Sequence, residues 1–265
     1  MSRNTKLKIL QVLTAAVLVA VFFIEPVAQD TGYHQFADGD TKMGIPNAWN
    51  VLSNIPFVLI GIFGLIVSEK QLPKKSLVSH RVPVLMFFIG LILTGLGSAY
   101  YHLSPTNETL LWDRLPMTIS FMAFFSFILA RHLDQRLGIR ALWPLLLIGA
   151  SSVFYWSYTE TIGFGDLRFY AVVQFLPIIL IPLLLLLFPV SDYQQKYIWL
   201  ILVLYMTAKL MENFDADIYY IVGISGHAMK HIIAAFSGVA FLLAVWNIGR
   251  YDEKVIKQGE HRSTQ

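Results

Sequence analysis

Residues 226–248 read GHAMKHIIAAFSGVAFLLAVWNI, a long apolar run with two histidines near its start. A helix needs about 20 mostly apolar residues to cross a bilayer, and this segment is long enough. Similar runs lie along the whole chain, at about 7–24, 49–67, 83–103, 114–131, 141–158, 169–188, 196–211 and 226–248. We therefore predict an all-α integral membrane protein with eight spans.

The composition of the 265 residues supports the same fold class. Hydrophobic residues make up 56% of the chain and charged residues only 14%, whereas soluble domains carry about 25% charged residues. A soluble globular enzyme is therefore excluded. The chain has no cysteine, which excludes disulfides and thiolate metal sites. Its short loops leave no room for a separate soluble domain, and we find no nucleic-acid signature and no sign of an obligate protein partner.

The basic residues predict how the chain lies in the membrane. If the N-terminus is cytoplasmic and the eight spans alternate, 15 of the 20 lysines and arginines fall in cytoplasmic segments. Three others are on the outer side and two lie within spans: Lys42, Arg114, Arg168, Lys209 and Lys230. This bias follows the positive-inside rule, so we expect both termini in the cytoplasm. The compact loops suggest a bacterial inner membrane.

The chain divides into three parts. Residues 1–30 hold the first helix, residues 31–250 hold seven further helices, and residues 251–265 form a basic cytoplasmic tail. The first run has the basic start and apolar core of a signal peptide. Residues 26–28, Pro-Val-Ala, make a poor cleavage site, so we favour an uncleaved transmembrane helix.

Three polar groups interrupt the apolar pattern, at residues 97–102, 112–117 and 226–231, and the predicted topology places all three at the outer side. His227 and His231 are four residues apart, so they share a helix face and can chelate one metal ion. With His102 there are three imidazoles, and three protein ligands plus an open position for water are typical of catalytic zinc. Asp113 could then accept the water's proton or orient the water, and Ser98 could stabilise the developing oxyanion.

At these residues the chain resembles the alkaline ceramidase family, which is part of a superfamily of seven-helix membrane hydrolases that includes the adiponectin-type receptors. The family signature is a Ser-x3-His at the end of one helix, an Asp opening the next, and a His-x3-His on the last. Here these are Ser98 and His102, then Asp113, then His227 and His231. Residues 47–54 also resemble the first core helix of the family, and the similarity covers about residues 32–250.

The resemblance implies a seven-helix hydrolase-type bundle, preceded here by one extra helix. It implies zinc bound by His102, His227 and His231, with Ser98 and Asp113 as catalytic residues. The reaction would be hydrolysis of the N-acyl amide of a ceramide-like lipid from the bilayer, giving a fatty acid and a sphingoid base. One alternative is a receptor-like lipid sensor with a structural zinc and no turnover. Another is a transporter or haem protein that uses the histidines as axial ligands.

The chain departs from the family pattern at two positions. Arg114 follows Asp113, where family members often have an acidic residue. Animal members also carry an acidic calcium-binding stretch before the first core helix. The nearest equivalent here runs from Asp38 to Asn47, with Asn47 where a glutamate is expected, so a calcium ion is doubtful.

Other charged residues lie close to these motifs. Lys209 and Glu212 are spaced to pair at i,i+3. Acidic and amide residues at 212–217 would either hydrogen-bond the ligating imidazoles or form a solvated loop. Lys230 should point about 100° away from His231 and extend to the outer headgroups. We interpret Asp166 and Arg168 as a helix cap with an interfacial anchor, rather than as a gate or a headgroup site.

Overall fold

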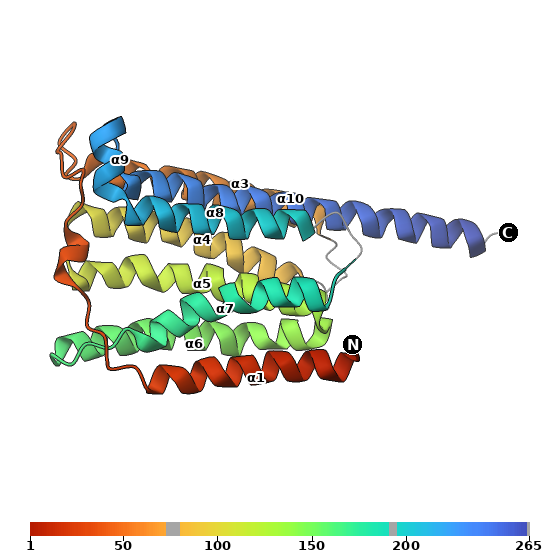
Figure 1. The fold of residues 1–265 in the computed structure, drawn as a ribbon. Coiled ribbons are helices and arrows are strands. Elements are labelled where there is room, and N and C mark those ends of the chain that lie inside the picture. The colour runs from red at the N-terminus through yellow and green to blue at the C-terminus, as the bar shows by residue number, and fades with distance from the viewer. Residues whose placement is uncertain (73–79, 191–194, 264–265) are drawn as a thin grey trace.

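The computed structural model describes residues 1–72, 80–190 and 195–263, which form a bundle of long helices that run side by side (Figure 1). The long helices are α1 (Arg3–Phe22), α3 (Ile55–Gln71), α4 (Arg81–Leu103), α5 (Asn107–His132), α6 (Gln135–Thr161), α7 (Arg168–Leu187), α8 (Gln195–Asn213) and α10 (Gly226–Ser263). Shorter helices are η1 (Thr31–His34), α2 (Ala48–Leu52) and α9 (Asp215–Val222). The last residues of the predicted basic tail, 264–265, lie outside the described residues.

The membrane fold predicted from the apolar runs is confirmed. In the described part of the chain, seven helices are long and apolar enough to cross a membrane. The pair α8 and α9, bent by 81°, passes the same test together and gives up to eight spans. The start of α1 and the end of α10 lie at one end of the bundle, and α9 lies at the other (Figure 1).

Side-chain caps define where several helices begin. Thr106 and Thr109 form a reciprocal capping box at the start of α5. The Asp134 carboxylate accepts a hydrogen bond from Leu137 N at the start of α6, and the Ser225 hydroxyl accepts one from Ala228 N at the start of α10. These caps satisfy backbone N–H groups that have no partner within the helix.

The helices differ in how far they are enclosed. In α5, 61% of the membrane-spanning window is buried inside the bundle, against 6% in α1. The extra N-terminal helix α1 therefore lies at the periphery, where it packs on α7. The core between α4, α5 and α10 is aromatic: Phe241 packs against Phe87 and Phe127, with ring centroids 4.4 and 5.0 Å apart. These three helices carry the predicted site.

The segment 23–47 crosses the end of the bundle where α9 lies (Figure 1). Backbone groups along it are tied to three other elements. Val27 O accepts a hydrogen bond from Leu167 N, Gln29 N donates to the Glu160 carboxylate, and Ala37 N donates to the Asp215 carboxylate. The segment therefore has fixed contacts across this end of the bundle, and its side chains can contribute to a site there.

The region after the seventh span differs from the expectation of a simple break. Residues 215–222 form the helix α9. Asp215 and Asp217 lie in its first turn, where negative charge favours a helix N-terminus. Gly223 ends the helix in the left-handed conformation, with φ of 76°. The acidic residues that we expected to mark a loop therefore begin a helix.

Candidate metal centre

Three histidines from two helices that are distant in sequence meet at one point. His102 lies in the last turn of α4, and His227 and His231 lie in the first two turns of α10. Their ring centroids are 4.9 to 5.0 Å apart, and one ligand nitrogen from each lies within 4.8 Å of the others. All three side chains are buried. The three histidines could therefore hold a metal ion.

A hydrogen bond fixes the orientation of the His231 ring. Its Nδ1 lies 2.8 Å from the Ser53 hydroxyl, and that hydroxyl lies 3.1 Å from the carbonyl oxygen of Asn50. If Ser53 donates to the carbonyl, it accepts the Nδ1 proton of His231. The lone pair of Nε2 is then free for a metal ion. Such outer contacts commonly orient metal-binding imidazoles.

The two ring nitrogens of His102 are available to bind a metal ion. Neither of its ring nitrogens has a hydrogen-bond partner, although both are buried. Buried polar atoms without partners are uncommon and need an explanation. Phe36 from the crossing segment packs over the rings of His102 and His227, with centroids 4.6 and 4.5 Å away. The donor set and these unpartnered nitrogens fit a metal ion that is shielded on this side by an aromatic ring.

The start of α10 is held in place by contacts outside the triad. The Asp215 carboxylate accepts a hydrogen bond from His227 N at 2.7 Å. The Ser225 hydroxyl lies 3.0 Å from Asn50 Oδ1, and Asn50 Nδ2 donates to Asp38 O at 3.0 Å. Because these groups join α2, the crossing segment and α10, they fix the position of two of the three imidazoles.

Ser98 and Asp113 line a cavity beside the triad, with a volume of about 260 Å³. Ser98 lies one helical turn before His102 on α4, and its hydroxyl is buried without a hydrogen-bond partner. Asp113 lies on α5, which crosses α4 closely here: a Cβ at Gly97 would overlap the carbonyl oxygen of Trp112. Small residues commonly allow such close packing in membranes. The triad borders the cavity through His231.

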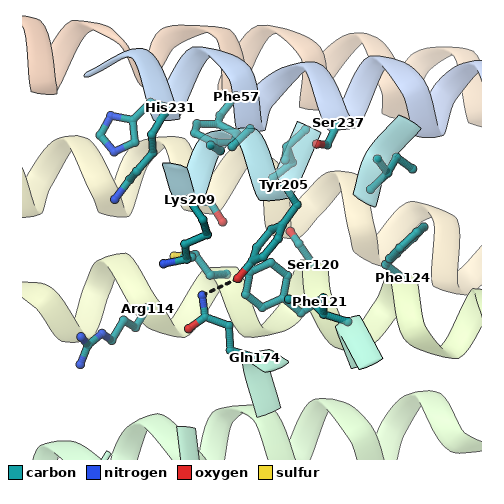
Figure 2. A pocket seen from close by; sticks show the side chains of 18 of the residues that line it. Phe57, Arg114, Ser120, Phe121, Phe124, Gln174, Tyr205, Lys209, His231 and Ser237 are labelled. Atoms are coloured by element: carbon teal, nitrogen blue, oxygen red, sulfur yellow. Dashed lines mark hydrogen bonds between the residues drawn. The ribbon is translucent and has the colours of Figure 1, made fainter. Parts of the chain in front are cut away.

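The cavity has one polar end and a long apolar wall. Figure 2 shows His231, Lys209 and Arg114 toward one end, with Phe121 and Phe124 farther along. Gln174 Nε2 donates to the Tyr205 hydroxyl at 3.0 Å between these regions. A lipid chain could lie along the aromatic and aliphatic wall while its polar end approaches His231.

Two expectations about charged residues need correction. Lys230 does not extend to the headgroups: its ammonium lies 2.6 Å from the Glu212 carboxylate and lines the cavity. Residues 212–217 do not hydrogen-bond the imidazoles in the described structure. Instead, Glu212 pairs with both Lys209 and Lys230. The i,i+3 pair of Lys209 and Glu212 is confirmed at 2.6 Å.

Tyr33 is a hydrogen-bond donor at the polar end of the cavity. Its hydroxyl donates to the Glu212 carboxylate at 3.2 Å. Burial, together with the charge of Glu212, holds the pKa of Tyr33 well above its ordinary value. The hydroxyl therefore stays protonated and remains a donor.

At the start of α7, Leu167 is the N-cap residue and makes no side-chain cap hydrogen bond, so Asp166, one residue earlier, is not the N-cap that we expected. The Asp166 carboxylate accepts hydrogen bonds from Arg168 N at 3.0 Å and forms an ion pair with its guanidinium at 2.8 Å. The Arg168 guanidinium also donates to Ile24 O. The two residues thus join the start of α7 to the end of the α1 region.

The acidic residues of the crossing segment lie in different environments. Asp38 is buried with both carboxylate oxygens unpartnered, and burial raises its pKa. Asp40, however, is half exposed and faces Lys42 at 3.7 Å, while the Asn47 amide donates to His102 O. Calcium prefers six to eight oxygen ligands. Among the described residues, the histidine triad is the group of three or more metal-binding side chains.

Comparison with known families places the chain in one of them. Residues 41–258 match the family model described as Ceramidase, so the chain belongs to the ceramidase family. The match covers all three histidines, Ser98 and Asp113. A search of curated proteins finds no match to the chain. Membership supports hydrolysis of ceramides in general, by an amidohydrolase that acts on lipid in the membrane.

Proposed function

We propose that this protein hydrolyses the N-acyl amide of a ceramide-like lipid and depends on zinc. The observation that carries the proposal is the set of three buried imidazoles whose ligand nitrogens lie within 4.8 Å of one another. His102, His227 and His231 would hold the ion. Zinc supplies Lewis-acid activation of water when bound. Imidazole ligands suit this metal, and a site with three protein ligands keeps a position open for chemistry.

The chain's own residues perform the remaining tasks. Asp113 takes the proton of the attacking water on its carboxylate and passes it to the amide nitrogen as the carbon–nitrogen bond breaks. The Ser98 hydroxyl, which is buried and unpartnered, donates to the oxygen that becomes negative. The products are a fatty acid and a sphingoid base, and the apolar cavity wall holds the acyl chain.

We propose that the lipid enters sideways from the bilayer. Phe36 covers His102 and His227 on the side of the crossing segment, whereas the cavity runs between α4, α5, α7, α8 and α10. Following the charge bias, the triad lies toward the outer face and both termini are cytoplasmic. The compact loops favour a bacterial inner membrane as the host.

Metal content and lipid turnover together test this function. We expect about one zinc per wild-type chain and release of fatty acid from ceramide. Replacing His102, His227 and His231 together with alanine should remove both. His132, which bonds the carbonyl of Phe188 near the start of α1, provides the control, because His132→Gln should keep zinc and activity. Equal zinc in the wild type and the triple variant would contradict the proposal.

Single substitutions separate chemistry from metal binding. Asp113→Asn and Ser98→Ala should retain zinc while kcat falls by about a hundredfold or more, because each removes a group that acts in the transition state. Zinc-loaded wild-type protein that binds ceramide and releases no product would instead favour a lipid sensor.

A further inference from the structure

The polar end of the cavity carries more positive than negative charge. Its ionisable side chains, apart from histidine and tyrosine, are Asp113, Arg114, Lys209, Glu212 and Lys230. Three of these are basic and two are acidic. Ionisable groups within membrane spans are costly and are usually paired or functional. The excess of one positive charge therefore needs a physical reason.

The two lysines share a single carboxylate. Lys209 Nζ lies 2.6 Å from Glu212 Oε2, and Lys230 Nζ lies 2.6 Å from Glu212 Oε1. One carboxylate balances only one of the two ammonium groups. Each ammonium has three N–H donors, and the described residues accept one hydrogen bond from each. Donors remain for a ligand in the cavity.

Arg114 has no carboxylate partner among the described residues. Its side chain is 7% exposed, and its Nη2 donates to the neutral Gln29 amide at 2.6 Å. Its Nη1 is buried without a partner. The guanidinium carbon lies 4.3 Å from the Trp156 ring centroid and 5.0 Å from that of Tyr170. Aromatic faces attract a cation, but they do not neutralise its charge. Glu212 balances one of the three cations and Asp113 a second, so one positive charge is left over.

These cations lie beside the proposed reaction centre. Figure 2 shows Lys209 of α8 and Arg114 of α5 on opposite walls, at the same end of the cavity as His231. Lys230 precedes His231 on α10. A lipid whose amide lies at His231 would therefore place its polar end near basic groups from three helices. An anionic oxygen group there would balance the excess charge and accept hydrogen bonds from the free donors.

We propose that the substrate carries an oxyanion, such as a phosphate or a sulfonate, close to its amide, bound by Lys209, Lys230 and Arg114. This inference rests on the proposed function and specifies its substrate class: an anionic N-acyl lipid, preferred over a neutral ceramide.

Two matched pairs of lipids test the inference. Ceramide 1-phosphate differs from ceramide by one phosphate, and N-palmitoyltaurine differs from N-palmitoylethanolamine by a sulfonate in place of a hydroxyl. With purified zinc-loaded protein in neutral detergent, we expect kcat/KM for at least one anionic lipid to exceed that of its neutral partner by about tenfold or more. The pair with the larger ratio of anionic to neutral kcat/KM identifies which oxyanion the site accepts.

Charge-removing variants locate the effect. Lys209→Met should reduce the ratio of anionic to neutral kcat/KM several-fold. It keeps the Lys230–Glu212 pair, and the Lys209 side chain is 36% exposed, so little packing is lost. Arg114→Gln should do the same, and Arg114→Lys should restore part of the preference. The matched control is Arg81→Gln, because Arg81 pairs with Glu69 away from the cavity and its loss should leave the ratio unchanged.

The outcomes separate this inference from the proposed function. If ceramide is turned over at least as fast as every anionic lipid, the inference is overturned and the proposed function stands. The inference is also overturned if the preference for the anionic lipid persists in both Lys209→Met and Arg114→Gln. If no lipid is hydrolysed, the proposed function fails. The inference is then tested by the melting temperature of the protein in the presence of each lipid. Stabilisation by ceramide 1-phosphate above that by ceramide, lost in Lys209→Met, supports it, and equal stabilisation overturns it.

Discussion

Single residues outside the triad determine how the imidazoles are presented. Ser53 contacts His231 Nδ1 at 2.8 Å, and Asn54 lies 3.5 Å from the same nitrogen. A ring held at Nδ1 offers Nε2 in one direction, which lowers the entropy lost when a metal ion binds. The proposed zinc affinity therefore depends on side chains that do not ligate the ion.

We expect Ser53→Ala to weaken zinc binding roughly 10- to 100-fold, because loss of such an orienting contact typically has this effect. Competition with a chromophoric chelator measures the affinity. Ser152→Ala is the matched control, since the Ser152 hydroxyl is also buried and donates to the Gly149 carbonyl on α6. An unchanged zinc affinity in Ser53→Ala would show that Ser53 does not orient the ring.

The ion pair of Asp166 and Arg168 provides a prediction about pH. The hydrogen bonds from Arg168 hold the pKa of Asp166 below its ordinary value. Stability from the ionised carboxylate is therefore fully present above the unfolded pKa, about 3.9, and is lost as the pH falls through the lower folded pKa. Asp166→Asn should lower the melting temperature at pH 7, and the difference from the wild type should shrink below about pH 4.

Asp40→Asn is the control for this pH series. Asp40 is half exposed and lies 3.7 Å from Lys42, and exposed pairs contribute little stability. The melting temperature of Asp40→Asn should equal that of the wild type at every pH of the series. A difference for Asp166→Asn that is constant from pH 7 to pH 3.5 would contradict the assigned role of the charge.

Among the elements, the crossing of α4 and α5 has the greatest influence on the site. It brings Ser98 and His102 of one helix beside Asp113 of the other, and Gly97 makes the close approach possible. A side chain at this position would push the two backbones apart. The geometry of the candidate site therefore depends on the absence of a Cβ at residue 97.

We expect Gly97→Ala to destabilise the protein by about 1–3 kcal/mol, as overpacking usually does. Activity should fall further than stability, because Asp113 moves away from Ser98 and His102. Thermal unfolding and ceramide turnover measure the two effects. Gly39→Ala is the control, since a Cβ there would come no closer than 3.8 Å to a neighbouring side chain. A stable and fully active Gly97→Ala would refute this account.

At the scale of the whole molecule, the bundle places the start of α1 and the end of α10 at the same end (Figure 1). A chain that crosses the membrane an even number of times has both of its termini on the same side. Together with the charge bias, it predicts that both termini face the cytoplasm. A fluorescent protein fused to the C-terminus should fluoresce, and alkaline phosphatase fused there should be inactive. An active phosphatase fusion would reverse the assignment.

The fold was predictable because each crossing leaves a long apolar run in the sequence, since backbone polar groups in lipid must be satisfied within the helix. The triad was predictable because His227 and His231 share a helix face and His102 lies at the same depth. Ser53 was not, because its partner is 178 residues away. The direction of Lys230 was also missed: helical spacing gives its angle from His231, but not that Glu212 lies within reach.

The ring of Phe36 has a consequence for the supply of reactants. Hydrolysis consumes one water molecule per lipid, yet this ring covers His102 and His227 on the side of the crossing segment. While the ring stays in place, water would reach the centre along the same path as the lipid. A smaller side chain at residue 36 would open a second route and uncouple the delivery of water from the arrival of the lipid.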